Sequence, residues 1–390
     1  MTRVEDRLRE HYRDEVAGLE VPDLLPRVLA AGRRARRRSR LAATVGIAGV
    51  VAAAAVGSVL VLGPAISQRP AHRPASRPYT VITRTSVSPF WGPVSGMAAV
   101  PGGVWLASWE QGELVRIDAG SGHITARVRV GRPQDGVNSI AYGAGSLWVT
   151  DSQTGGLLRL DPATGRPLAT VHLPGGAFGD VAVGGGFVWV DQWGPADGSL
   201  YRLAKVSPVT GRLVARRRIP GKCGPGGLTI AGSATGAWVY VGYCSVQAVD
   251  PASLRLLGSA RTGGDLAATG PRVWTLSQGT LSRIDPPWTT VARRVQLYPN
   301  PDNVAPRYSA QNLGAQTLVP GPARTLWAAG PALYQVDETT MRAQTISRFG
   351  PVDNVSVIGQ TLWVQTEDQF GYHQYVYQLA LHRASSPPPG

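Results

Sequence analysis

Three segments of the chain combine acidic, aromatic and amide side chains in a way that suits ligand binding. They are Asp191–Gly198 (DQWGPADG), Tyr298–Asn312 (YPNPDNVAPRYSAQN) and Glu367–His373 (EDQFGYH). Aromatic rings can cover the apolar faces of a sugar or peptide, while charged and amide groups fix its orientation. We predict a ligand site whose contact residues are Asp191, Trp193, Arg307, Tyr308, Glu367 and Tyr372. Trp109, Glu110 and Asp151 occupy corresponding positions. The alternative is that these segments are only polar, solvated loop tips.

The sequence offers no catalytic motif to go with these residues. It lacks a phosphate-binding P-loop, a His-Glu-x-x-His zinc motif and a Gly-x-Ser-x-Gly nucleophile turn, and no Cys/His cluster has zinc spacing. Only His373 belongs to one of the three segments, and a single histidine without a positioned partner is usually a surface or packing residue. We therefore assign no catalytic residue, metal or cofactor and favour a function other than catalysis.

Seven repeats of roughly forty residues must position the three segments. The clearest, Ser139–Leu173, reads as four short β-runs with an Asp-Pro-Ala-Thr-Gly turn between the third and fourth. Each repeat carries a tryptophan in its second run: Trp105, Trp148, Trp189, Trp238, Trp274, Trp327 and Trp363. Four short strands per unit predict an all-β fold, a seven-bladed β-propeller, with these tryptophans packed between blades rather than on a ligand.

Propeller topology places the three segments on one face. Loops from second to third strands, and from a fourth strand to the next first strand, lie at the same end of the central channel. The last repeat ends with its third run, Tyr375–Leu381, so it lacks a fourth strand. We expect Tyr79–Val87, which precedes the first repeat, to supply that strand and remove an open sheet edge.

The phrase "SLWVTD…LLRLDPATGRPLATV" and its copies resemble the repeats of YVTN-type, PQQ-repeat and virginiamycin-lyase-like β-propellers. The resemblance covers about Tyr79–Leu381 and implies the fold, whereas this superfamily hosts lyases, cofactor binders and scaffolds alike. The His/Glu constellation of the lyases has no matching positions here. Quinoproteins of this kind usually have eight blades and adjacent cysteines, whereas Cys223 and Cys244 are 21 positions apart. The resemblance therefore leaves a propeller enzyme, lyase or hydrolase, as the alternative function.

The two cysteines are candidates for a disulfide. Cys223 precedes the first strand of the fourth repeat and Cys244 ends its second, so antiparallel pairing would bring them together. An oxidising compartment would favour the bond.

The N-terminal region reads as a membrane anchor. Leu41–Leu62 is 22 residues without charge or proline, enough to cross a hydrocarbon core of about 30 Å. Six arginines between Arg33 and Arg40 precede it, which predicts a cytoplasmic N-terminus and a propeller outside the cytoplasm. The alternative is a cleaved signal peptide, although the apolar run is long for one. The leader resembles those of membrane-anchored proteins from high-GC bacteria.

We thus expect a short, basic and helical cytoplasmic leader (1–40), a transmembrane helix (41–62), a Pro-rich linker (63–78), the propeller (79–382) and a disordered tail (383–390). The net charge of +14 comes from 39 basic and 25 acidic residues of the whole chain, and outside the leader the basic residues form no dense run. A diffuse basic surface does not indicate a nucleic-acid partner.

The predicted function is a binding or scaffold module of the cell envelope, with a polymer or a protein as its partner.

Overall fold

The computed structural model describes residues 78–87, 94–133, 137–151, 155–173, 178–192, 202–219, 229–232, 239–242, 245–299, 318–346, 349–367 and 373–382. The chain divides into two compact units, Met1–Arg73 and Pro74–Gly390, and all described residues belong to the second. Within the described ranges, no helix is long and apolar enough to cross a membrane. The predicted span Leu41–Leu62 lies outside them, as do the leader, most of the linker and the C-terminal tail.

The regular elements of the described residues are 28 strands in seven four-stranded antiparallel sheets. Blade 1 has β2 (Val94–Val100), β3 (Gly103–Ser108), β4 (Glu113–Asp118) and β5 (Ile124–Arg129). Blade 2 has β6 (Val137–Gly143), β7 (Ser146–Asp151), β8 (Gly156–Leu160) and β9 (Pro167–His172). Blade 3 has β10 (Phe178–Gly184), β11 (Phe187–Gln192), β12 (Arg202–Val206) and β13 (Leu213–Arg218).

The remaining sheets follow the same order along the chain. Blade 4 has β14 (Thr229–Gly232), β15 (Val239–Gly242), β16 (Val246–Val249) and β17 (Leu256–Ala260). Blade 5 has β18 (Asp265–Thr269), β19 (Arg272–Ser277), β20 (Thr280–Ile284) and β21 (Arg293–Gln296). Blade 6 has β22 (Leu318–Gly321), β23 (Thr325–Ala328), β24 (Leu333–Asp337) and β25 (Ala343–Ile346). Blade 7 has β26 (Val352–Ile358), β27 (Thr361–Glu367), β28 (Gln374–Leu381) and β1 (Tyr79–Ser86).

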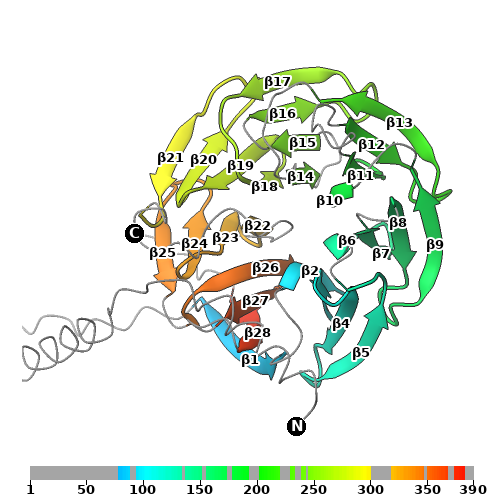
Figure 1. Cartoon of the computed structure of the whole chain (residues 1–390). Coiled ribbons are helices and arrows are strands. Elements are labelled where there is room, and N and C mark those ends of the chain that lie inside the picture. The colour runs from blue at the N-terminus through cyan, green and yellow to red at the C-terminus, as the bar shows by residue number, and fades with distance from the viewer. Residues whose placement is uncertain are drawn as a thin grey trace, which may run out of the picture. The chain divides into compact units, whose positions relative to one another are not determined.

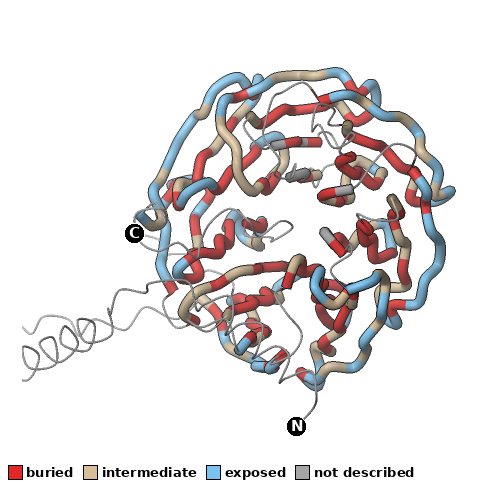
Figure 2. The backbone as a smooth tube through the Cα atoms, viewed as in Figure 1, coloured by how far each residue is buried: buried red, intermediate tan, exposed pale blue. Residues whose placement is uncertain are grey.

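The sheets are arranged as a ring around a central axis, which is the axis of the predicted channel (Figure 1). Their innermost strands are neighbours in the order β2, β6, β10, β14, β18, β22 and β26, and β26 lies beside β2 again. Burial falls from the inner strands to the outer ones, where exposed and half-buried residues alternate in β5 and β13 (Figure 2). This arrangement confirms the predicted all-β propeller of four-stranded blades.

The first and last described strands close the ring. β1 pairs antiparallel with β28 from Tyr79 opposite Leu381 to Ser86 opposite Tyr375. The Val87 amide extends the contact by donating to the Gln374 carbonyl at 3.0 Å. The expected fourth strand of the last blade is therefore confirmed.

The marker tryptophans are packing residues, as predicted. The six within the described ranges, all but Trp238, are at most 1% exposed. Each packs against the next blade, as Trp363 of blade 7 does in one apolar cluster with Met97 and Leu106 of blade 1. A cation lies over several of the rings, including Arg159 at 5.6 Å from the centre of Trp148. Part of the positive charge is thus structural.

The turns between third and fourth strands share one mechanism in most blades. In blade 2 the Asp161 Oδ1 accepts from the Ala163 amide at 3.0 Å and from the Thr164 amide and hydroxyl at 2.8 Å. The Thr164 hydrogen bonds hold the pKa of Asp161 below its ordinary value. Asp118, Asp250 and Asp337 cap the same turn and also have lowered pKa values. These aspartates fold the turns and do not contribute to the predicted site.

Candidate functional site

Four innermost strands begin with a β-bulge, and the four bulges define one end of the channel. The extra residue is Ser95 in β2, Asn138 in β6 and Asp353 in β26, while in β10 Gly179 and Asp180 together oppose Asp191. Loops from second to third strands emerge at this same end. We call this end of the propeller the bulge face. Bulges leave backbone groups outside the regular ladder and re-aim side chains, so they are common beside functional sites.

Side chains from one blade bond the carbonyls near the bulge of the next blade. The Ser95 hydroxyl donates to the Val137 carbonyl at 2.9 Å, and the Thr150 hydroxyl donates to the Gly179 carbonyl at 2.7 Å. These bonds cross from blade 1 to blade 2 and from blade 2 to blade 3. They satisfy buried carbonyl acceptors and join neighbouring blades at the bulge face.

Blade 3 places two carboxyl groups together on the bulge face. Asp180 lies in β10, and the neighbouring strand β11 carries Asp191, which is fully buried. A Cβ added to Gly179 would come within 2.5 Å of the Asp191 carboxylate, so the glycine makes room for that group. In blade 7 the corresponding positions hold an amide pair, in which the Asn354 Nδ2 donates to the Gln365 Oε1 at 2.8 Å.

The surroundings of Asp180 disfavour its ionised form. Burial raises the pKa of Asp180 well above its ordinary value, and the negative charges of Asp191 and Asp265 add to the effect. A hydrogen bond from Ser139 acts in the opposite direction. Asp265 opens β18 in blade 5, so groups from blades 2, 3 and 5 influence the same carboxyl.

A second pair lies in blade 7. Burial and then the charge of Glu367 raise the pKa of Asp353 to about 7. The Gln365 Nε2 donates to the Asp353 Oδ2 at 3.3 Å and opposes that rise. A carboxyl group with such a pKa exchanges its proton near neutral pH, so it both donates and accepts hydrogen bonds.

The structure describes two of the six predicted contact residues. Asp191 and Glu367, expected in loops, belong to the ends of β11 and β27, and each lies beside a partner carboxyl on the bulge face. The strands extend further than the sequence indicated, because pairing resumes beyond the bulges, as between Phe178 and Gln192 and between Val352 and Thr366. Trp193, Arg307, Tyr308 and Tyr372 lie outside the described residues, as do Cys223 and Cys244 with their predicted disulfide.

The corresponding residues of blades 1 and 2 also lie at this end. Trp109, just after β3, is 42% exposed and Glu110 is exposed, whereas Asp151 at the end of β7 is buried. Among the large apolar side chains that the described ranges expose, Trp109 is the only aromatic one. The bulge face thus offers an aromatic surface as well as carboxyl groups.

Sequence reasoning missed Asp180 and Asp353, the inner members of the two pairs. They lie nine residues before Trp189 and ten before Trp363, at the start of the first strand of their repeats. When the repeats are aligned on the tryptophan, Asp180 corresponds to Gly96 of blade 1 and Asp353 corresponds to Ser95. This alignment would have revealed both acids. No group of three possible metal ligands occurs within the described part of the chain. The described residues of the bulge face can therefore form hydrogen bonds through carboxyl groups of raised pKa.

Comparisons of the sequence with protein-family models and with curated proteins gave no match. The likeness to YVTN-type, PQQ-repeat and lyase-like propellers therefore remains a resemblance of repeat sequence. The fold itself is established by the strands.

Proposed function

We propose that this chain is a binding module of the cell envelope whose ligand contacts the bulge face. The observation that carries the proposal is the gathering of Asp180 with Asp191, and of Asp353 with Glu367, at one end of the channel. An exposed aromatic ring, Trp109, lies at the same end. The ligand that fits is a polymer or a protein segment with hydroxyl, amide or amine donors and apolar faces.

The location of the module rests on the sequence of its N-terminal region. Leu41–Leu62 would anchor the protein as a single helix, and the arginines before it would keep the N-terminus in the cytoplasm. The propeller would then face the extracytoplasmic space. Its partner would be a cell-wall polymer or another envelope protein.

The proposal is tested by binding to isolated cell walls. Trp109→Ala, and the double variant Trp193→Ala with Tyr372→Ala, should weaken binding while the melting temperature stays nearly unchanged. Val209→Ala is the matched control, because Val209 is 83% exposed in the turn between β12 and β13, at the opposite end of the blades. Wild-type binding by both aromatic variants would show that the bulge face is not the site. Unfolding of a variant would assign its residues to packing.

The pKa of Asp353 favours one alternative, a propeller lyase or hydrolase. A carboxyl group with a pKa near 7 beside a second carboxylate is suited to general acid or base catalysis. In that case the protein should release soluble fragments from cell walls, and Asp353→Asn should abolish the release without unfolding the protein. Binding without release at any pH between about 5 and 8 would exclude this alternative.

A further inference from the structure

One turn of the propeller departs from the common pattern. In blades 1, 2, 3, 4 and 6 the fourth strand begins six positions after the residue that starts the turn, as from Asp161 to Pro167. In blade 5 it begins eight positions after, from Asp285 to Arg293. Asp285 also forms an ion pair with Arg283 at 2.9 Å, in place of the usual capping hydrogen bonds. The two additional residues therefore belong to a differently built loop.

This loop is tied to its own blade through the Pro271 carbonyl and packs closely against blade 4. Trp288 is only 7% exposed, and its indole N–H donates to the Pro271 carbonyl at 2.9 Å. The loop approaches β17 so closely that a Cβ at Gly258 would lie 2.0 Å from the Pro287 carbonyl oxygen. A buried tryptophan and a close backbone contact give the loop a defined position.

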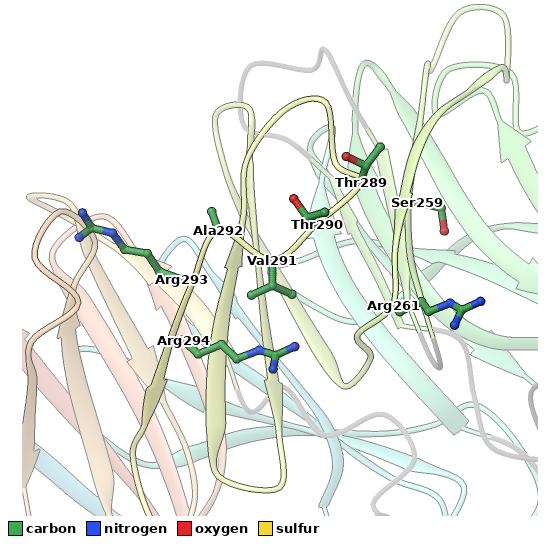
Figure 3. A pocket seen from close by; sticks show the side chains of 8 residues that line it. All are labelled: Ser259, Arg261, Thr289, Thr290, Val291, Ala292, Arg293 and Arg294. Carbon is green, nitrogen blue, oxygen red and sulfur yellow. The ribbon is translucent and has the colours of Figure 1, made fainter.

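The loop and the outer strands form an open groove of about 720 Å³ between blades 4 and 5 (Figure 3). Arginine and hydroxyl side chains dominate its lining, which includes Ser259, Arg261, Thr289, Thr290, Val291 and Arg294. Arg294 extends from β21 toward the segment that carries Ser259 and Arg261, whereas Arg293 points to the other side (Figure 3). No acidic residue lines the groove.

The positive charge of the groove is not neutralised by the described acids. The ion pairs of the described residues use Arg116, Arg129, Arg272 and Arg283, and none includes Arg261 or Arg294. Charged side chains on outer strands often serve only to prevent edge-to-edge aggregation. That explanation covers Arg294 in β21, but it does not cover Arg261, which follows β17, or the additional loop that forms one wall.

We propose that this groove binds a segment of a flexible anionic polymer through its phosphate groups. Guanidinium groups bind phosphate with two parallel hydrogen bonds, and the hydroxyls of Ser259, Thr289 and Thr290 supply further donors. Val291 offers an apolar contact for the carbon chain between phosphates. The groove extends along the outer wall, and Arg261, in the loop from β17 to β18, lies at its end nearest the bulge face. It uses none of the carboxyl groups on which the function proposed above depends.

The shape of the groove selects the polymer over a membrane surface. A recess walled by two blades admits a single chain, whereas a flat bilayer would meet the exposed arginines of the outer strands around the rim. A polymer chain can also place several phosphates along the opening, which strengthens binding beyond that of one phosphate.

The test measures binding of poly(glycerol phosphate) to the full chain. The double variant Arg261→Gln with Arg294→Gln should weaken binding about tenfold or more, because each loses a charge-assisted hydrogen-bonding group. The matched control is Arg127→Gln with Arg218→Gln, which removes the same charge from exposed positions of β5 and β13. The control should bind within about twofold of the parent.

Three outcomes would overturn the proposal. Equal loss in both double variants would mean that overall charge drives binding, not the groove. Unchanged binding in the groove variant would mean that the polymer binds elsewhere. A groove variant that loses only its binding to phosphatidylglycerol vesicles, and not to the polymer, would assign the arginines to lipid headgroups.

Discussion

Individual carboxyl groups in this protein have two distinct environments, which explains why their pKa values move in opposite directions. Asp161 and the aspartates of equivalent turns lie near the surface and accept hydrogen bonds, so their pKa values are lowered. Asp180 and Asp353 lie near a second carboxyl group at the channel mouth, so their pKa values are raised. The first environment stabilises the fold, whereas the second costs stability and indicates a role in binding.

The raised pKa of Asp353 predicts that the protein loses stability as the pH rises. The unfolded side chain ionises near its ordinary pKa of about 4, and the folded one near 7. The folded state therefore binds an extra proton between these values, and its free energy of unfolding falls as the pH rises from about 4 to 7. Asp353→Asn removes the cost, so it should raise the melting temperature at pH 8 more than at pH 5.

Asp161→Asn is the matched control for this measurement. Asp161 has a lowered pKa, so its ionised form contributes stability that is present above the ordinary pKa and is lost at acidic pH. Its amide variant should gain no stability at pH 8. If Asp353→Asn shows no larger gain at pH 8 than at pH 5, the carboxyl does not titrate with a raised pKa.

At the scale of strands and loops, the ring depends on a strand taken from the opposite end of the sequence. β1 pairs with β28 over its whole length and covers an edge that would otherwise be open. Tyr79 and Leu379 share an apolar cluster, so β1 contributes packing as well as backbone hydrogen bonds. Deleting Tyr79–Val87 should therefore lower the melting temperature sharply or prevent folding. A deletion variant with the melting temperature of the parent would contradict a structural role for this closure.

The predicted disulfide belongs to the same scale. If Cys223 and Cys244 pair, they close a loop of about 20 residues, which typically contributes roughly 2–4 kcal/mol to the free energy of unfolding. Reduction should then lower the melting temperature, and Cys223→Ser with Cys244→Ser should match the reduced protein. Two thiols titrated in protein purified without reductant would rule out the bond.

Most of the fold could be predicted from the repeats, but only one residue of each carboxyl pair could. One tryptophan in each repeat and Asp-x-x-Ser/Thr turns in four of the repeats identify strands, because packing and turn chemistry recur from blade to blade. Asp191 and Glu367 were recognisable because they begin segments that combine acidic, aromatic and amide side chains. Asp180 and Asp353 were not, because their position becomes meaningful only when the bulges bring first and second strands together at the channel mouth. The groove between blades 4 and 5 depends on contacts across blades, which no local pattern encodes.

At the scale of the whole molecule, two binding surfaces of different charge would share one propeller. The carboxyl pairs lie at the channel mouth, whereas the arginine-lined groove lies on the outer wall. The chemistry of the first suits donor groups and that of the second suits phosphates, so one protein could engage two components of the envelope at once. The proposed envelope function requires that the propeller faces the extracytoplasmic side.

That requirement leads to a prediction about topology. The uncharged stretch Leu41–Leu62 follows six arginines, so the leader should stay in the cytoplasm while the propeller is exported and remains attached. A protease added to intact cells should remove the propeller and leave the leader protected, whereas permeabilised cells should lose both. Replacing the six arginines with glutamine should reduce the fraction with this orientation, because cytoplasmic positive charge determines it. Recovery of a soluble propeller that begins near Gly63–Ser67 would instead show that the segment is a cleaved signal peptide.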